Sequence, residues 1–199
     1  QVTMLLRLPM TCHPNTLWER TYRLVVKSQI AYGKKMKLPW GVSESGYYAF
    51  DHHLNYQYKA FGVPELALKQ GIEKEKVIAP YSTILAAMVA PKQAVANMRR
   101  LKEYNAFGEF GFYEALDFTS DRFQEKEEYA VIKSYMAHHQ GMSLMALGNL
   151  LHGNLMHHRF LADPRVKGTD LLLHELIQSP TLIKTRKSIP RLLPGLRHL

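Results

Sequence analysis

The first part of the chain contains a long stretch in which apolar residues recur at helical spacing. Between residues 17 and 36 they follow one another at intervals of three, four or seven. These residues are Trp18, Tyr22, Val25, Tyr32 and Met36. Such a spacing gathers the side chains on one face of a helix. Asn15 or Thr16 can cap its start, with Glu19 completing a capping box after Thr16, and Pro39 ends it. The pattern predicts an amphipathic helix over residues 17–36.

Helical patterns continue through the rest of the chain. They predict further helices over residues 80–89, 91–104, 129–151, 154–161 and 168–178. Residues 51–61 fit an irregular loop or a short helix, and residues 113–118 fit a helical turn. No alternation of apolar and polar residues is long enough to indicate a strand. The pattern therefore predicts an all-α fold class.

The charge of the chain changes this picture only at its end. The 199 residues include 26 Lys and Arg and 17 Asp and Glu, which gives a formal net charge of +9. Residues 184–198 hold five of these basic residues and no acidic one, together with two prolines. We therefore predict a basic linker or tail over residues 180–199, and no nucleic-acid partner for the remainder, where both signs are mixed. No apolar run is long enough for a membrane-spanning helix.

The first candidate for chemistry is the segment PWGVSESGYYAFD. It places the acidic Glu44 beside Ser43, with Trp40 and Tyr47 nearby. Sugar-binding sites use this combination, because aromatic faces stack on the C–H surface of a sugar ring while carboxylates and hydroxyls bind its oxygens. The alternative is an exposed loop glutamate whose aromatic neighbours anchor the loop.

A second acidic residue, Glu114, lies in the segment GEFGFYEALDF among aromatic and apolar residues. Burial among such residues raises the pKa of a carboxyl group toward the range of a general acid. The alternative is an acid that is favoured at a helix N-terminus. Glycoside hydrolysis needs two carboxylates, one as acid and one as nucleophile or base. Glu44 and Glu114 are therefore the predicted catalytic pair, with the two roles left open between them.

The third candidate segment is KSYMAHHQGMS. On a helix it presents Tyr135 and His139 on one face with His138 at its edge, and Gln140 adds an amide. These groups suit a polar, sugar-binding surface. They do not suit a metal, because neighbouring residues of a helix diverge by about 100°. The sequence also lacks HExxH and a cysteine cluster, so we expect no metal site.

Five segments together resemble a known family. They are PWGVSESGYYAFD, LNYQYKAFGVPEL, VIAPYSTILAAMVAP, GFYEALDFT and KSYMAHHQGMSLMAL. In order and spacing they are similar to the glycoamylase-like domain of bacterial cyclic β-1,2-glucan synthases. The resemblance extends from about Leu17 to Ile177. It implies an (α/α)6 toroid of glycosidase type, of which this chain holds the C-terminal portion over residues 1–179.

The resemblance also implies a function. The domain would act on β-1,2-glucan by carboxylate-assisted glycosyl transfer, which closes a ring, or by hydrolysis, with Glu44 and Glu114 as its carboxylates and without a cofactor. The remaining predicted substrate-binding residues are Trp40, Ser43, Tyr47, Asp51, Tyr56, Gln57, Tyr58, Tyr135, His138, His139 and Gln140. The synthases of this family are large inner-membrane proteins, so the partners would be the other domains of such a protein, and the segment would lie on the cytoplasmic side as a soluble part.

Two alternatives remain open. One is a carbohydrate-binding module that has the same groove but no catalysis. The other is a structural or nucleic-acid-interacting helical domain that binds no glucan.

Overall fold

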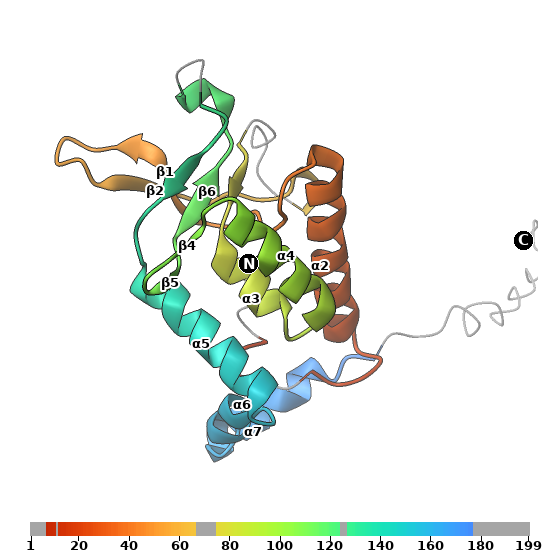
Figure 1. Cartoon of the computed structure of the whole chain (residues 1–199). Coiled ribbons are helices and arrows are strands. Elements are labelled where there is room, and N and C mark those ends of the chain that lie inside the picture. Colours follow the sequence, from red (N-terminus) through yellow and green to blue (C-terminus); the bar gives the residue numbers. More distant parts are fainter. Residues whose placement is uncertain (1–6, 11, 67–74, 124–126, 177–199) are drawn as a thin grey trace, which may run out of the picture.

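The computed structural model describes residues 7–10, 12–66, 75–123 and 127–176 (Figure 1). About half of these residues are helical, and short strands occur among them. The all-α class is therefore correct only in part. The predicted tail over residues 180–199 lies outside the described residues. Within the described part, no helix is long and apolar enough to cross a membrane.

The first described helix, α2, confirms the predicted boundaries. It runs from Leu17 to Met36, and the Thr16 side chain accepts a hydrogen bond from the backbone N–H of Glu19. The Glu19 carboxylate in turn accepts one from the N–H of Asn15 at 2.7 Å, so the capping box is present with a shift of one residue. Lys37 ends the helix in the left-handed conformation.

The central helices are α3, Pro80–Ala86, and α4, Pro91–Glu103. Both begin with Pro, as predicted, because Pro needs no hydrogen-bond acceptor at the first turn of a helix. Figure 1 shows them between α2 and the later helix α5, Ala137–Leu151. The first hydrophobic core forms here, where Tyr22 and Val26 of α2 pack near Tyr81 and Leu85 of α3.

Three small antiparallel sheets account for the difference from the all-α prediction. Strands β1 (Ser45–Phe50) and β2 (Tyr56–Lys59) form a hairpin, and β4 (Phe107–Gly108) pairs with β5 (Gly111–Phe112). The third sheet has the order β3-β6-β7, with β3 at Val77–Ile78, β6 at Ala115–Asp117 and β7 at Ala130–Ile132. Strand β1 also contacts β6 and β7.

These strands correct three predictions. Residues 51–61 include β2 of a hairpin rather than a short helix, residues 113–118 contain β6, and residues 129–136 are not helical but contain β7. All three residues of β6, including the polar Asp117, are buried, so buried and exposed positions do not alternate along it. A buried strand this short cannot be told from a helical turn by its sequence pattern. Tertiary pairing therefore decided these segments.

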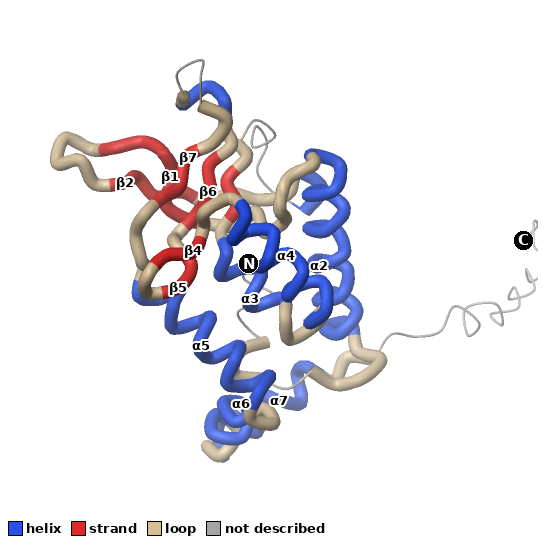
Figure 2. Tube along the Cα trace, viewed as in Figure 1, coloured by secondary structure: helices blue, strands red, loops and turns tan. Residues whose placement is uncertain are grey.

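The last described helices form the end of the molecule opposite the strands (Figure 2). Helix α6 spans Leu155–Phe160, α7 spans Pro164–Asp170, and the 3₁₀ turn η3 spans Leu171–Leu173. Two further 3₁₀ turns are η1, Pro64–Leu66, and η2, Ser120–Arg122. The predicted bounds 168–178 are wrong. Helix α7 begins at Pro164, where Asp163 caps it through the N–H of Arg165, and it ends at Asp170.

Candidate active site

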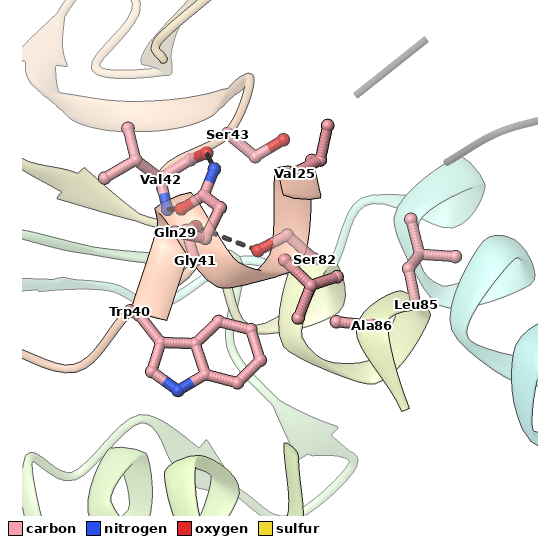
Figure 3. Close-up of a pocket in the computed structure, with 10 residues that line it drawn as sticks. Val25, Gln29, Trp40, Gly41, Val42, Ser43, Ser82, Leu85 and Ala86 are labelled. Carbon is pink, nitrogen blue, oxygen red and sulfur yellow. Dashed lines mark hydrogen bonds between the residues drawn. The ribbon is translucent and has the colours of Figure 1, made fainter. Parts of the chain in front are cut away.

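The loop between α2 and β1 carries Glu44 and is firmly held. The side-chain amide of Gln29 donates to the carbonyl of Val42 at 2.8 Å and accepts from its N–H at 3.0 Å. The Ser82 hydroxyl donates to the carbonyl of Gly41 at 2.9 Å, as Figure 3 shows. Gly41 has φ of +124°, and a Cβ there would lie 2.7 Å from Ser82 Oγ, so the position requires glycine. The loop therefore presents Glu44 from a fixed backbone.

The pocket in Figure 3 lies beneath this loop and is not a sugar site. Its cavity volume is about 40 Å³, and its walls are mainly apolar side chains of α2, α3 and Trp40. Ligand pockets measure about 300–1,000 Å³. Trp40 itself is buried, accepts the Asn97 amide at its carbonyl and belongs to the core. The predicted sugar-stacking indole is therefore not at the surface.

Glu44 and Glu114 are joined by a row of two side chains. The Tyr58 hydroxyl donates to Glu44 Oε1 at 2.8 Å. The same hydroxyl oxygen lies 3.3 Å from Nε2 of His139. On the other side of the ring, Nδ1 of His139 lies 2.9 Å from Glu114 Oε2. The two predicted carboxylates thus belong to one hydrogen-bonded row, although they come from distant parts of the sequence.

The inner end of this row is enclosed. Glu114 is 2% exposed and His139 is 1% exposed. The second oxygen of Glu114 accepts the N–H of Gly46 at 3.1 Å, so both of its oxygens are engaged. A cavity of about 30 Å³ lies beside the pair, lined by residues that include Phe112 and Ser143. A space of this size has room for water but not for a sugar ring.

The outer end of the row is open. Glu44 is half-buried, Tyr58 is 39% exposed, and His138 is exposed with its Nε2 3.4 Å from the Tyr58 hydroxyl. Burial of the hydroxyl and its hydrogen bond to Glu44 raise the pKa of Tyr58 well above its ordinary value. Tyr58 therefore stays protonated and remains a donor at neutral pH.

Tyr81 supports the row from α3 and was missed in the sequence. Its ring stacks on His139 with centroids 3.7 Å apart and an angle of 11° between the planes. Its hydroxyl lies 2.8 Å from Ser43 Oγ and donates to the carbonyl of Glu44 at 3.2 Å. Burial raises the pKa of Tyr81. The only signal was its place in the segment VIAPYSTILAAMVAP, which carries no chemistry by itself.

Gly46 was also missed. Its N–H binds Glu114, and a Cβ at this position would lie 3.3 Å from Glu114 Cγ. This close approach is visible only in three dimensions, because the two residues are far apart along the chain.

Three other predicted site residues, Ser43, Gln140 and Tyr135, support the site. Ser43 is buried and binds Tyr81, while Gln140 donates to the carbonyl of Phe112 at 3.1 Å. The Tyr135 hydroxyl accepts from the N–H of Phe110 at 3.4 Å, and its ring packs near Tyr113. These three side chains therefore hold the loops around the row rather than extend it.

The β1–β2 hairpin carries the remaining ones. Gln57 pairs with Tyr47 across the hairpin, and Tyr56 pairs with Phe50. Asp51 lies at the hairpin turn and accepts from the N–H groups of His53 and Asn55, of which the Asn55 contact is the main cause of its lowered pKa. Asp51 therefore stabilises the turn.

A charged network fixes the other side of the hairpin. The buried Asp117 accepts from the N–H of Tyr48 at 3.0 Å and from Arg122 at 2.6 Å. The Arg122 guanidinium also lies over the ring of Tyr47, 4.4 Å from its centroid, and pairs with Glu75. The Tyr47 ring is thus covered on one face by a cation, which sets its orientation.

Most of the sequence matches a known protein family. A family model described as "Putative glucoamylase" matches residues 9–163. The cyclic β-(1,2)-glucan synthase NdvB of Rhizobium meliloti (strain 1021) is 46% identical over 156 residues, which are 78% of this chain but only 6% of that synthase.

Two crystal structures share the fold, each of a protein described as a "putative glucoamylase". The one from Bacteroides caccae has a TM-score of 0.55 at 21% identity and covers 83% of this chain and 38% of its own. The one from Bacteroides fragilis has a TM-score of 0.51 at 23% identity and covers 78% and 33%. Since the family model spans most of the sequence, the chain belongs to the glycoamylase family.

Proposed function

We propose that the chain is part of an enzyme that acts on β-1,2-glucan by carboxylate-assisted glycosyl transfer, which closes a ring, or by hydrolysis. The similarity to a cyclic β-(1,2)-glucan synthase supports this substrate. The observation that carries the proposal is the row from Glu44 through Tyr58 and His139 to Glu114, because it unites the predicted carboxylates in one polar site.

Glu44 is the carboxylate that acts at the glycosidic bond. It lies at the open end of the row, next to the exposed side chains of Tyr58 and His138. Glycosidic cleavage requires a carboxyl group that reaches the anomeric carbon or the oxygen of the leaving sugar. In ring closure the bond formed is of the same type as the bond broken, so double displacement with retention is the simplest route. That route needs a nucleophile and an acid that later acts as base; Glu44 fills one of these two roles, and the other falls to a group of the larger protein.

Glu114 acts through His139. Both of its oxygens are engaged, and its Oε2 accepts the Nδ1–H of the imidazole, which leaves the Nε2 lone pair facing the Tyr58 hydroxyl. The proton of Tyr58 is then shared between Glu44 and His139. We therefore propose Glu114 as a positioning residue, which narrows the role that the sequence suggested for it.

The remaining proposals concern the larger protein. The chain covers 38% of the Bacteroides caccae protein, and several leucines at the far end of α5 are exposed. Both facts support an incomplete (α/α)6 toroid over residues 1–179, completed by other parts of a larger synthase. In that arrangement the domain lies at the cytoplasmic side of an inner membrane, and residues 180–199 lead out of the domain.

The test is Glu44→Gln in the whole protein that contains this chain, assayed on linear β-1,2-glucan. We expect the rate to fall by about 10²–10⁴-fold, the size of a lost acid, base or nucleophile. Glu103→Gln, at the exposed end of α4, is the matched control and leaves the rate unchanged. Full activity in Glu44→Gln contradicts the proposal, and glucan binding without turnover in the wild type indicates a binding module instead.

The role of Glu114 has its own test. If Glu114 acts through His139, Glu114→Ala loses activity and added azide does not restore it, because azide replaces only a carboxylate that touches the sugar. Rescue by azide in Glu114→Ala, and none in Glu44→Ala, assigns Glu114 as the nucleophile.

A further inference from the structure

Three side chains with metal-binding atoms meet at the end of the molecule opposite the strands. His13 lies in the loop before α2, Asp170 ends α7, and His174 follows η3. One nitrogen or oxygen of each lies within 4.8 Å of the others, which makes this the only such group among the described residues. His13 and Asp170 are partly buried, and the side chain of His174 is 46% exposed.

These contacts are longer than the His139–Glu114 contact described above. His13 Nε2 lies 3.2 Å from each oxygen of Asp170, and His174 Nε2 lies 3.4 Å from Oδ2. The enclosed His139–Glu114 pair is at 2.9 Å, which is an ordinary hydrogen-bond length.

The spacing is also compatible with ligands around a metal ion. Zn²⁺ binds histidine nitrogen and carboxylate oxygen at about 2.0–2.2 Å, so neighbouring ligands of a tetrahedral site lie about 3.3–3.5 Å apart. The two Nε2–Asp170 distances fall at or just below this value, and all three side chains are of types that Zn²⁺ selects.

The types of the ligands also suit a metal. Imidazole nitrogen and carboxylate oxygen are both ligands of Zn²⁺, and the carboxylate of Asp170 supplies a negative charge. The rings of His13 and His174 lie next to each other, with centroids 3.6 Å apart and an angle of 34° between the planes.

The backbone already holds the ligands near one another. Thr16 and Leu176 form an antiparallel bridge, and the N–H of Leu17 donates to the carbonyl of Glu175 at 2.9 Å. The Thr16 hydroxyl donates to the carbonyl of His13 at 2.7 Å. Asp170 and His174 stand four residues apart. A metal would therefore bind a junction that the fold has already formed, and little chain entropy would be lost on binding.

We infer that His13, Asp170 and His174 form a binding site for a first-row divalent transition metal, with Zn²⁺ the best fit. The ion joins the segment before α2 to the segment after α7, and the exposed side of His174 leaves a fourth position for water. The site shares no residue with the Glu44–Glu114 row, so its role is to stabilise the junction. It was not expected from the sequence, because His13 lies far from Asp170 and His174 along the chain.

The test is titration of the metal-free full chain with Zn²⁺ against a chromogenic chelator, with Co²⁺ as a second probe for its visible absorption. We expect one ion per chain, a tetrahedral Co²⁺ spectrum and a higher melting temperature with Zn²⁺. His13→Ala and His174→Ala each weaken Zn²⁺ binding by more than about tenfold, the least that even an indirect partner of a metal site contributes.

Two further variants serve as controls. His152→Ala, an exposed histidine outside the group, keeps the affinity of the wild type. His174→Gln preserves the bulk of the side chain, so a circular dichroism spectrum like that of the wild type shows that weaker binding does not reflect unfolding. Absence of stoichiometric binding, or equal affinity in the wild type and in His13→Ala and His174→Ala, overturns the inference and leaves the group as an ion-pair and hydrogen-bond network only.

Discussion

Helix α5 has two faces with opposite surroundings. On one face His139, Ser143 and Asn149 are buried, and His139 contacts Glu114, Tyr58 and Tyr81. On the other face Leu144 is 72% exposed and Leu151 is 69% exposed. The same helix therefore buries polar side chains and exposes large apolar ones.

The comparison shows that tertiary contacts of polar side chains are concentrated around the row from Glu44 to Glu114. The buried polar groups there have partners from three other elements, as burial demands. Exposed leucines continue beyond α5 into η3, where Leu171 is 73% and Leu172 is 77% exposed. Large exposed apolar side chains are typical of surfaces that take part in contacts.

The largest expected difference between the two faces comes from Glu114→Ala, which removes the buried partner of His139. The change leaves the His139 Nδ1 and the Gly46 N–H without their buried acceptor, so we expect unfolding to become easier by about 3 kcal/mol. Leu144→Ala, on the exposed side of the same helix, changes the free energy of unfolding by less than about 0.5 kcal/mol. Urea denaturation of the three proteins measures both, and equal losses would contradict the comparison.

A smaller difference is expected from two glycines. A Cβ at Gly33 would lie 2.7 Å from Trp40 Cβ, just before the loop that carries Glu44, whereas a Cβ at Gly148 meets nothing within 4 Å. Gly33→Ala therefore lowers stability by about 1–3 kcal/mol through overpacking. Gly148→Ala, in the interior of α5, raises it by about 0.5–1 kcal/mol. Melting temperatures of the two variants show whether each substitution stabilises or destabilises the protein. A stabilising Gly33→Ala would show that Trp40 moves freely.

The smallest expected effect on stability comes from His157 in α6 and depends on pH. Its Nε2 donates to the carbonyl of Arg7 at 2.9 Å, and its buried Nδ1 has no partner among the described residues. Burial lowers the pKa of His157 below 6.5, the value taken for the unfolded chain. The fold therefore favours the neutral ring, and its contribution to stability is complete above pH 6.5 and lost as the pH falls through the lowered pKa.

His157 changes the free energy of unfolding by at most about 1.4 kcal/mol per pH unit. We expect His157→Phe to lose less stability than the wild type between pH 7 and pH 5, while the exposed control His152→Ala follows the wild type. Unfolding midpoints measured at several pH values test this, and parallel curves for the wild type and His157→Phe would rule the effect out.

Some features were determined by the sequence alone. The bounds of α2 and the starts of α3 and α4 followed from apolar spacing, a capping residue and Pro, all of which act within one or two turns. The segments that carry Glu44, Glu114 and His139 were recognised from their composition and from their resemblance to a family, which is now shown. These features depend on neighbours in the sequence, so the sequence was sufficient.

Other features were decided only by the tertiary structure. The three-residue strand β6 is set by pairing with β3 and β7, and the enclosure of Glu114 is set by Gly46 and His139. Trp40 became a core residue because α2, α3 and α4 surround it. His13 meets Asp170 and His174 across most of the length of the chain. Each of these depends on contacts between distant residues, whose free energy of pairing and burial overrides the local preference of a short segment.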